Sequence, residues 1–295
     1  MPKNKHKPSE AVKSSEGRQY HINLAPGELA DYVLLCVDPA RARRVAGLFD
    51  EVTLERSNRE FLSCTGTYKG HPISVIGTGI GQANTEIIFV EAIQLYEKKR
   101  PTMIRVGSCG GLQPDVAIGD LVITSGSVRM ENTSTHFVDQ GYPAVAHHEV
   151  VLALLTAADQ LGVPYHVGLT ASTSGFFGAQ GRSVGGLEPR DPGVAERLAA
   201  WNVLNMEMES STLLTLGNLA GVRTGAVCTV YSNRARGEWI GDSKRSVSDH
   251  AAERVGMEAV RLLAMMDAYK AKHQKPNFVP QWVRFSLGAE GEYRG

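Results

Sequence analysis

The chain has 295 residues, of which 42% are hydrophobic and 21% are charged, and its 31 Lys and Arg balance its 31 Asp and Glu. This balance gives no overall positive field for nucleic acid, and no apolar run approaches the roughly 20 residues of a membrane-spanning helix. Four cysteines without a C-x-x-C pair indicate reduced thiols and a cytoplasmic location. We therefore expect a soluble protein with no nucleic-acid partner and no membrane partner.

Short β-branched runs alternate with helical patterns along the chain, and this alternation predicts an α/β fold around a sheet that is at least partly parallel. The predicted strands cover residues 32–37, 73–77, 102–106, 120–124, 166–172 and 225–231. The predicted helices cover residues 40–49, 84–99, 150–161, 192–201, 210–220 and 246–273. We expect a three-layer fold with a mixed central sheet and helices on both faces.

The length fits one α/β domain, which we place at residues 18–273. Residues 1–17 are rich in Lys, Ser and Pro and lack the apolar segment of a secretory signal, so we expect a disordered tail there. Residues 274–295 form a C-terminal extension, in which Trp282 and Phe285 predict docking against a surface.

Two carboxylates, Glu207 and Glu209, flank Met208 directly before a predicted helix. One interpretation is that they face the amide dipoles at the helix N-terminus. In extended geometry, however, both side chains point to the same side, where one ligand with adjacent hydroxyls would satisfy them and the Met208 thioether would pack beside it. The ribose of a nucleoside has such a pair of hydroxyls.

Two glycine-rich turns follow predicted strands. The turn from Gly77 to Gly81 reads G-x-G-x-G instead of G-x-G-x-x-G, so we expect no nicotinamide cofactor. Exposed backbone amides in such a turn can still cradle an anion. Arg105 precedes the second turn, and its guanidinium would suit either a phosphate or a structural ion pair with an acid such as Asp120.

Ordered motifs between about residues 20 and 271 are similar to those of one enzyme family. They are Asp38-Pro39-x-Arg41, Arg59-Glu60-Phe61, Gly77-Thr78-Gly79-Ile80-Gly81, Arg105-Val106-Gly107-Ser108, Phe176-Phe177-x-x-Gln180-x-Arg182, Asn205-Met206-Glu207-Met208-Glu209-Ser210 and Asn233-Arg234. In these motifs the chain resembles the uridine phosphorylases of the nucleoside phosphorylase superfamily. The resemblance implies that residues 18–273 are a nucleoside phosphorylase catalytic domain.

The resemblance also implies which residues bind each part of the substrates. Phosphate would be held by Val37, Arg41, Arg105 and Ser108, and by Arg59 of a neighbouring subunit. Ribose would be held by Glu207, Met208 and Glu209, and by His21 of a neighbouring subunit. The base would be held by Phe176, Gln180, Arg182 and Arg234. Fork-shaped guanidinium donors suit phosphate oxygens, and the aromatic ring suits stacking on the base or sugar.

The implied reaction is phosphorolysis of uridine or a related pyrimidine nucleoside to uracil and ribose 1-phosphate, with Arg105, Glu209 and Arg182 as catalytic residues. Phosphate is a co-substrate, and no cofactor is expected. Related purine enzymes have an acid where this chain has Asn233, so an amide here favours a pyrimidine. Some relatives bind a monovalent cation through a serine, but Asn84 takes that position, so we expect no metal.

Three alternatives stay open at this stage. A nucleoside hydrolase would have little need for the cluster of Arg41, Arg59 and Arg105, and a nucleoside phosphorylase could prefer another base. A non-catalytic nucleoside-binding protein is favoured by Val37, because the resembling enzymes have a glycine there whose N–H contacts phosphate. If a neighbouring subunit supplies His21 and Arg59, the protein is at least a homodimer.

Overall fold

The computed structural model of the chain describes residues 9–97 and 99–280. The strands are β1 (Tyr32–Cys36), β2 (Glu51–Asn58), β3 (Phe61–Tyr68), β4 (His71–Gly77), β5 (Thr102–Gly111), β6 (Leu121–Met130), β7 (Ala144–Val145), β8 (Tyr165–Thr173), β9 (Val203–Glu207), β10 (Arg223–Asn233) and β11 (Glu238–Trp239). The helices are α1 (Pro39–Ala46), α2 (Gln82–Ile93), α3 (His148–Gln160), α4 (Val194–Ala200), α5 (Ser210–Ala220) and α6 (Asp242–His273), with short 3-10 turns at Ser134–His136 and Gly178–Gln180.

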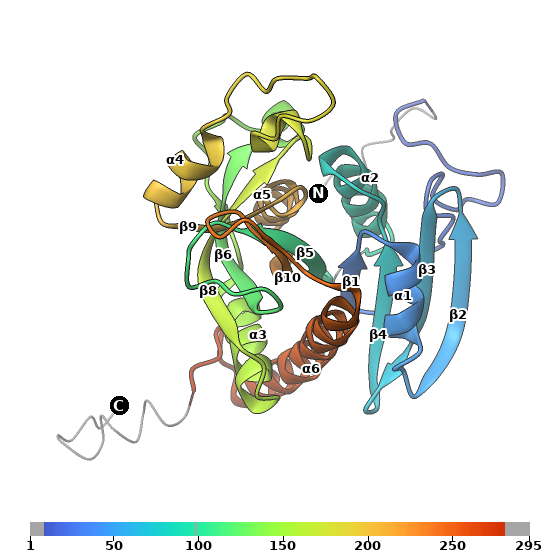
Figure 1. Ribbon diagram of the computed structural model, residues 1–295. Helices are drawn as coiled ribbons and strands as arrows, with labels where there is room; N and C mark the ends of the chain where they lie inside the picture. The colour runs from blue at the N-terminus through green and yellow to red at the C-terminus, as the bar shows by residue number, and fades with distance from the viewer. Residues whose placement is uncertain (1–8, 98, 281–295) are drawn as a thin grey trace, which may run out of the picture.

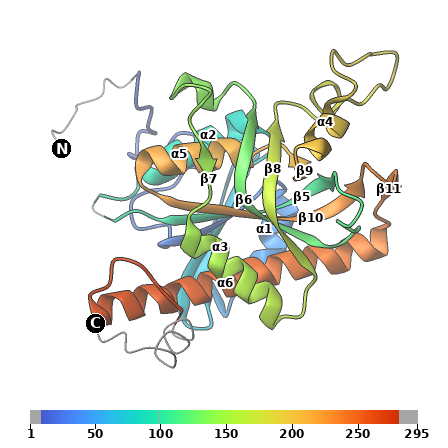
Figure 2. The same cartoon turned by 90° about the vertical axis from the view of Figure 1, so that its left-hand side faces the viewer.

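The strands form one mixed, eleven-stranded sheet between two layers of helices (Figure 1). Turned by 90°, the molecule shows α2 and α5 on one side of the strands and α3 and α6 on the other (Figure 2). The α/β class, the mixed sheet and the helices on both faces are thus confirmed. Within the described residues, no helix combines the length and the apolar character that crossing a bilayer requires.

Parallel strands at the centre of the sheet bring several strand ends together. β1 pairs in parallel with β4 and β5, and β5 pairs in parallel with β10. β10 also pairs with β6, so that β10, β6, β8, β9 and β5 close into a ring. In sheets of this kind, ligands bind beyond the carboxyl ends of the parallel strands.

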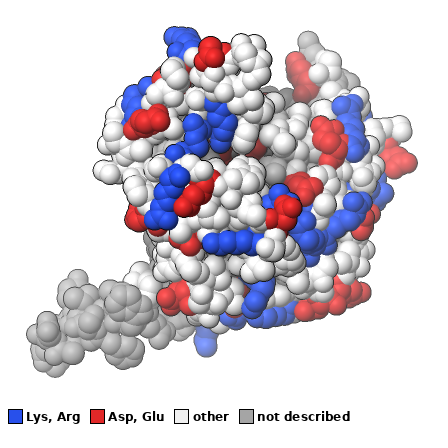
Figure 3. Space-filling view, in the orientation of Figure 1, with Lys and Arg blue, Asp and Glu red and all other residues white. Residues whose placement is uncertain are grey.

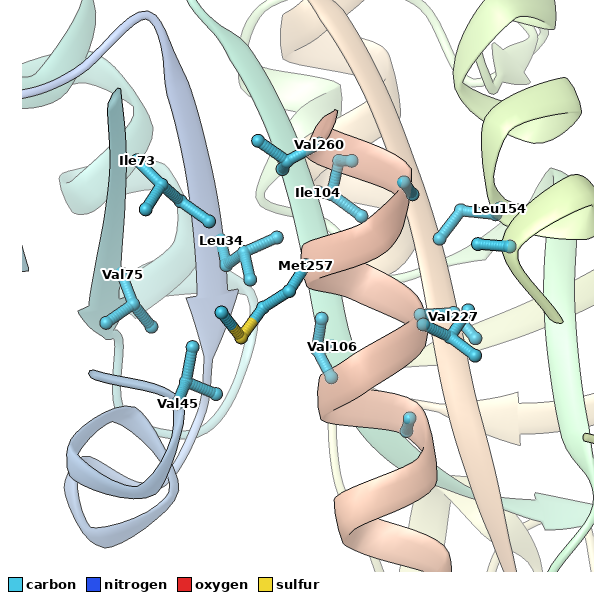
Figure 4. Packing of buried hydrophobic residues seen from close by; sticks show 14 of the residues in the cluster. Leu34, Val45, Ile73, Val75, Ile104, Val106, Leu154, Val227, Met257 and Val260 are labelled. Carbon is cyan, nitrogen blue, oxygen red and sulfur yellow. The ribbon is translucent and has the colours of Figure 1, made fainter. Parts of the chain in front are cut away.

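Both faces of β1 are buried, which explains its continuous apolar sequence. Leu34 and Cys36 pack with the core residues of α1, α3 and α6, whereas Val33 and Leu35 pack with those of α2 and α5. Figure 4 shows Met257 and Val260 of α6 beside Leu34 and the neighbouring strands. Truncating a fully buried leucine such as Leu34 to alanine typically lowers the free energy of unfolding by about 2–5 kcal/mol. Packing of this core therefore stabilises the position of the strand ends.

Helix α1 begins immediately after β1 because two residues at its start favour a helix. The Asp38 carboxylate accepts a hydrogen bond from the Ala40 N–H at 2.9 Å, and Pro39 takes up the first helical position, where its missing N–H costs nothing. The turn from β1 into α1 therefore places Arg41 in the first turn of the helix, close to the end of the sheet.

The sequence patterns locate most elements but leave out β2, β3 and β9, as well as the two-residue strands β7 and β11. β2 is largely exposed and carries few apolar residues, and β9 has only five residues, so neither gives the apolar run by which strands are recognised. β5 and β6 also continue several residues beyond their predicted ends.

The two ends of the chain are described in part. Residues 1–8 of the predicted tail lie outside the described residues, and Lys13 forms a β-bridge with Gln19. α6 ends at His273, and in the extension the Phe278 N–H donates to Glu149 at 2.9 Å. Trp282 and Phe285, for which docking is predicted, lie outside the described residues.

Candidate active site

A cavity of about 220 Å³ lies at the ends of β1, β5, β9 and β10. The predicted site residues that line it are Val37, Arg105, Ser108, Phe176, Gln180, Arg182, Glu207, Met208 and Glu209. Residues predicted for phosphate, for ribose and for the base therefore share one cavity. The face drawn in Figure 3 carries acidic and basic side chains interspersed, with no region of a single sign dominating it.

Arg105 is buried between two carboxylates. Its Nε donates to Glu207 Oε2 at 2.8 Å, and its Nη2 lies 2.6 Å from Glu209 Oε2. Gly107 makes room for this arrangement, because a Cβ there would lie 2.6 Å from the Arg105 guanidinium carbon. The alternative ion pair of Arg105 with Asp120 is wrong, because Asp120 pairs with His166 at 2.9 Å.

Glu207 holds the local backbone in addition to Arg105. Its carboxylate accepts hydrogen bonds from the N–H groups of Glu209 at 2.9 Å and Ser210 at 3.0 Å, and from the Ser172 hydroxyl. These amides start helix α5, so the carboxylate faces the positive end of the helix dipole. Glu207 therefore fits the interpretation in which a carboxylate faces the amide dipoles at the helix N-terminus. It also lines the cavity.

Glu209 reaches across to another element. One carboxylate oxygen accepts from the Gly81 N–H at 2.6 Å, in the turn before α2, and the other meets Arg105. Burial raises the pKa of Glu209 above its ordinary value, although Arg105 opposes this rise. Burial lowers the pKa of Arg105, but the Glu209 and Glu207 carboxylates outweigh burial and hold it above its usual range, so the guanidinium stays charged.

The residues predicted for the base are connected to one another by hydrogen bonds. Arg182 Nη1 donates to the Phe176 carbonyl at 2.7 Å and to the Gln180 side chain, and its guanidinium carbon lies 4.0 Å from the centre of the Phe176 ring. Arg234 lies outside the cavity lining and donates to the Gln180 carbonyl at 3.0 Å. Burial and the nearby Arg234 charge lower the pKa of Arg182 to about 10, so Arg182 is still a cation at pH 7.

The residues predicted for phosphate divide into two groups. Val37 and Ser108 line the cavity, and Val37 is not among the described non-glycine residues with positive φ, so its backbone is unstrained. Arg41 is outside the lining and donates to Asp249 at 2.7 Å and to the Tyr231 hydroxyl at 2.6 Å. Tyr231 lines the cavity, and the sequence reasoning missed both it and Asp249 because neither carries a motif.

His21 and Arg59 lie together elsewhere on the molecule, and neither lines the cavity. His21 Nδ1 is 2.6 Å from Glu91, and the Asn58 amide donates to the His21 carbonyl at 2.7 Å. Arg59, in the turn between β2 and β3, donates to the Tyr20 hydroxyl at 3.0 Å and is exposed. Within one subunit, these two residues are therefore not part of the site formed by Arg105 and Glu209.

Asn233, from which a pyrimidine base is predicted, and Asn84, from which the absence of a metal is predicted, both donate hydrogen bonds to backbone carbonyls. The Asn233 amide nitrogen donates to the carbonyls of Gln113 and Val116 at 2.9 and 2.8 Å, and Asn233 does not line the cavity. The Asn84 amide donates to the Ile80 carbonyl at 3.2 Å. In the described residues, no group of three or more His, Cys, Asp and Glu side chains is arranged to hold a metal ion.

Comparisons with known proteins agree with this architecture. The family model described as "Phosphorylase superfamily" matches residues 31–264. The uridine phosphorylase of Thermococcus kodakarensis is 44% identical over 90% of this chain and 94% of its own length. The uridine phosphorylase of Haemophilus influenzae is 37% identical over 83% of this chain and 98% of its own length.

Among solved structures, a Trypanosoma brucei nucleoside phosphorylase described as showing uridine phosphorylase activity superposes with a TM-score of 0.77. It is 26% identical and covers 84% of this chain and 98% of its own. Because the family model spans most of the chain and the curated relatives match it nearly end to end, the chain belongs to the phosphorylase superfamily.

Proposed function

We propose that this protein is a uridine phosphorylase, a pentosyltransferase that cleaves uridine or a related pyrimidine nucleoside with inorganic phosphate in pyrimidine salvage. The observation that carries the proposal is the shared cavity, which is lined by Arg105, Glu207 and Glu209 and also by Gln180 and Arg182. The names of the uridine phosphorylases among its relatives support the same activity.

In the proposed reaction, a phosphate oxygen forms a bond to C1′ of the ribose while the bond from C1′ to the base nitrogen breaks. The electron pair of that bond goes to uracil, which then takes up a proton, and the other product is ribose 1-phosphate. Arg105, Arg41 and Ser108 would hold the phosphate, and the Val37 N–H would add a backbone donor. The reaction needs no cofactor.

The sugar develops positive charge as the bond breaks, and the carboxylates in the cavity favour that charge. Glu209 would accept hydrogen bonds from the ribose hydroxyls, with Met208 packed against the sugar and Glu207 fixing the turn. Arg182 and Gln180 would stabilise the negative charge that moves to uracil. Arg182 remains protonated for this role at neutral pH, because its pKa is about 10. Phe176 would stack on the base, and Arg234 would hold the Gln180 segment.

We further propose a homo-oligomer in which His21 and Arg59 of one subunit complete the site of another. The position of both residues away from the cavity of their own subunit supports this proposal. Arg59 has φ of +53°, a region that residues other than glycine and asparagine rarely adopt, and such strain is often found at functional positions. The four cysteines are free and buried, in keeping with a cytoplasmic enzyme.

The test is to incubate the purified protein with uridine, with and without inorganic phosphate, and to measure uracil and ribose 1-phosphate. Uracil release that depends on phosphate supports the proposal. Release without phosphate would identify a nucleoside hydrolase, and binding of uridine without release would identify a non-catalytic protein. Parallel reactions with thymidine, deoxyuridine and purine nucleosides measure the base and sugar preference.

A further inference from the structure

Arg41 lies directly behind the cavity wall formed by Tyr231. The Tyr231 side chain lines the cavity, and its hydroxyl accepts a hydrogen bond from Arg41 Nη2 at 2.6 Å. The same hydroxyl donates to Asp249, at 2.6 and 2.7 Å from the two carboxylate oxygens. Arg41 Nη2 also donates to Asp249 at 2.7 Å, so the three side chains form a closed triangle.

One end of the Arg41 guanidinium has no acceptor in the described residues. Nε and Nη1 are buried and make no hydrogen bond, and Arg41 is only 5% exposed. Leaving buried N–H groups without an acceptor is unfavourable, and native structures rarely do so unless a water or a ligand supplies the acceptor. Because Nη2 is fully used by the triangle, Nε and Nη1 are the nitrogens left to donate to a further acceptor.

The surroundings of the triangle are balanced in charge. Arg44 lies 2.9 Å from Glu253 and 3.7 Å from Asp249, so two arginines face two carboxylates. Such a cluster does not repel an anion as an uncompensated pair of acids would. Glu253 also competes for Arg41, since its Oε1 is 3.8 Å from Arg41 Nε and its Oε2 has no hydrogen-bond partner in the described residues.

We propose that Asp249 and Tyr231 are positioning residues for phosphate, which hold Arg41 through Nη2 behind the cavity wall and leave Nη1 as its donor to a phosphate oxygen. This inference rests on the proposed function and adds two residues to its phosphate site. Without Asp249, the guanidinium would turn to Glu253, which is the nearest carboxylate on the next turn of α6. A donor held in place before the ligand arrives binds it more tightly than one that must first be ordered.

The experiment measures binding of inorganic phosphate alone by isothermal titration calorimetry, together with steady-state kinetics, for the wild type and three variants. Asp249→Asn keeps the size of the side chain and removes its charge, and Tyr231→Phe keeps the ring in the cavity wall. Glu258→Gln is the matched control, because Glu258 is also a buried acid of α6 paired with cations, Lys69 and Arg261, away from the cavity.

We expect Asp249→Asn to raise the phosphate Kd and the KM for phosphate about tenfold, the loss typical of one charge-assisted hydrogen bond. Tyr231→Phe should raise both about threefold to tenfold, because it removes a neutral hydroxyl. At saturating phosphate, kcat and the KM for uridine should stay within about twofold in both variants, a split that general loss of structure would not produce. Glu258→Gln should leave phosphate binding unchanged.

Unchanged or tighter phosphate binding by Asp249→Asn would overturn the inference, since tighter binding would mean that Asp249 competes with phosphate for Arg41. If Asp249→Asn does not fold, Tyr231→Phe decides alone, and unchanged phosphate binding by that variant refutes the positioning role. A wild type that binds phosphate without cleaving uridine would refute the proposed function, and the variants would still test the positioning of Arg41. A wild type that binds no phosphate overturns both.

Discussion

Arg105 Nη2 lies 2.6 Å from Glu209 Oε2, so a residue predicted for phosphate and a residue predicted for ribose are ion-paired in the cavity. The pair is buried, and removing either partner leaves an uncompensated charge. Arg105 and the Gly81 N–H hold the two oxygens of the Glu209 carboxylate, so the group that we propose as the acceptor for ribose has a fixed position.

Glu209→Gln should lower kcat/KM for uridine at least about 100-fold, because the neutral amide accepts hydroxyl protons weakly and does not favour positive charge on the sugar. The loss should be smaller for deoxyuridine, which offers one hydroxyl fewer. Initial rates of uracil release measure both. Activity of the variant within threefold of the wild type would contradict the assignment of Glu209 to ribose, and Glu258→Gln controls for the loss of a buried acid.

Gly107→Ala should disable the site by displacing Arg105. Gly107 lies inside β5, where the backbone suits alanine, but the new Cβ would lie 2.6 Å from the Arg105 guanidinium carbon. We expect kcat/KM to fall about 10- to 100-fold, the range expected when a catalytic group moves by about 1 Å.

The control is Gly141→Ala, where a Cβ meets no atom within 4 Å. Both variants should give the circular dichroism spectrum of the wild type, and only Gly107→Ala should lose activity. Equal activities in the two variants would show that Arg105 tolerates displacement.

Asp267→Asn should destabilise the fold in a way that depends on pH. Burial raises the pKa of Asp267, but hydrogen bonds from Arg223 and Tyr32 outweigh burial and bring the pKa to about 2, below the ordinary value of 3.8. Because the folded state binds the proton less tightly than the unfolded state, this stability is present above pH 3.8 and is lost as pH falls toward 2. Solvent screening of this partly exposed group reduces the expected loss to about 1–2 kcal/mol at pH 7.

Urea unfolding of the wild type and Asp267→Asn between pH 7 and pH 2 measures this difference, which should shrink as the pH falls below 4. Asp159→Asn, an exposed acid of α3, serves as the control and should show no such trend. A difference that stays constant over the whole range would mean that the effect of Asp267 does not come from its charge.

Mixing two inactive variants should restore activity if sites are shared between subunits. Arg59→Ala would remove the residue supplied to a neighbour, and Glu209→Gln would disable the cavity of its own subunit. In a mixed dimer, one of the two sites contains neither substitution, so random mixing in equal amounts should restore about one quarter of the wild-type activity. Reassembly after mild denaturation, followed by an assay of uracil release, measures this.

An inactive mixture, with dimers confirmed by light scattering, would mean that Arg59 does not complete the site of a neighbouring subunit. Each variant reassembled alone serves as the control and should remain inactive.

The sequence by itself determined the fold class, which depends on local patterns, and its family resemblance pointed to nine of the residues that line the cavity. Helix α5 spans residues 210–220 as predicted, since the apolar spacing and the glycine at position 221, which has φ of +65° in the C-cap, are sequence-local signals. Arg105 lies in β5, Glu209 comes shortly after β9, and Gln180 lies in a short 3-10 turn after β8. Because ligands bind at the strand ends of such sheets, their convergence could also be anticipated.

Only the tertiary structure decided the partners of these side chains. Arg105 pairs with Glu207 and Glu209 instead of Asp120, and Arg41 pairs with Asp249, which is 208 positions away along the chain. Such partners leave no periodic signal, because a hydrogen bond across a sheet depends on strand order and register and not on local spacing. The separation of Arg59 from the cavity has the same cause, since the hairpin of β2 and β3 carries it to the far edge of the sheet.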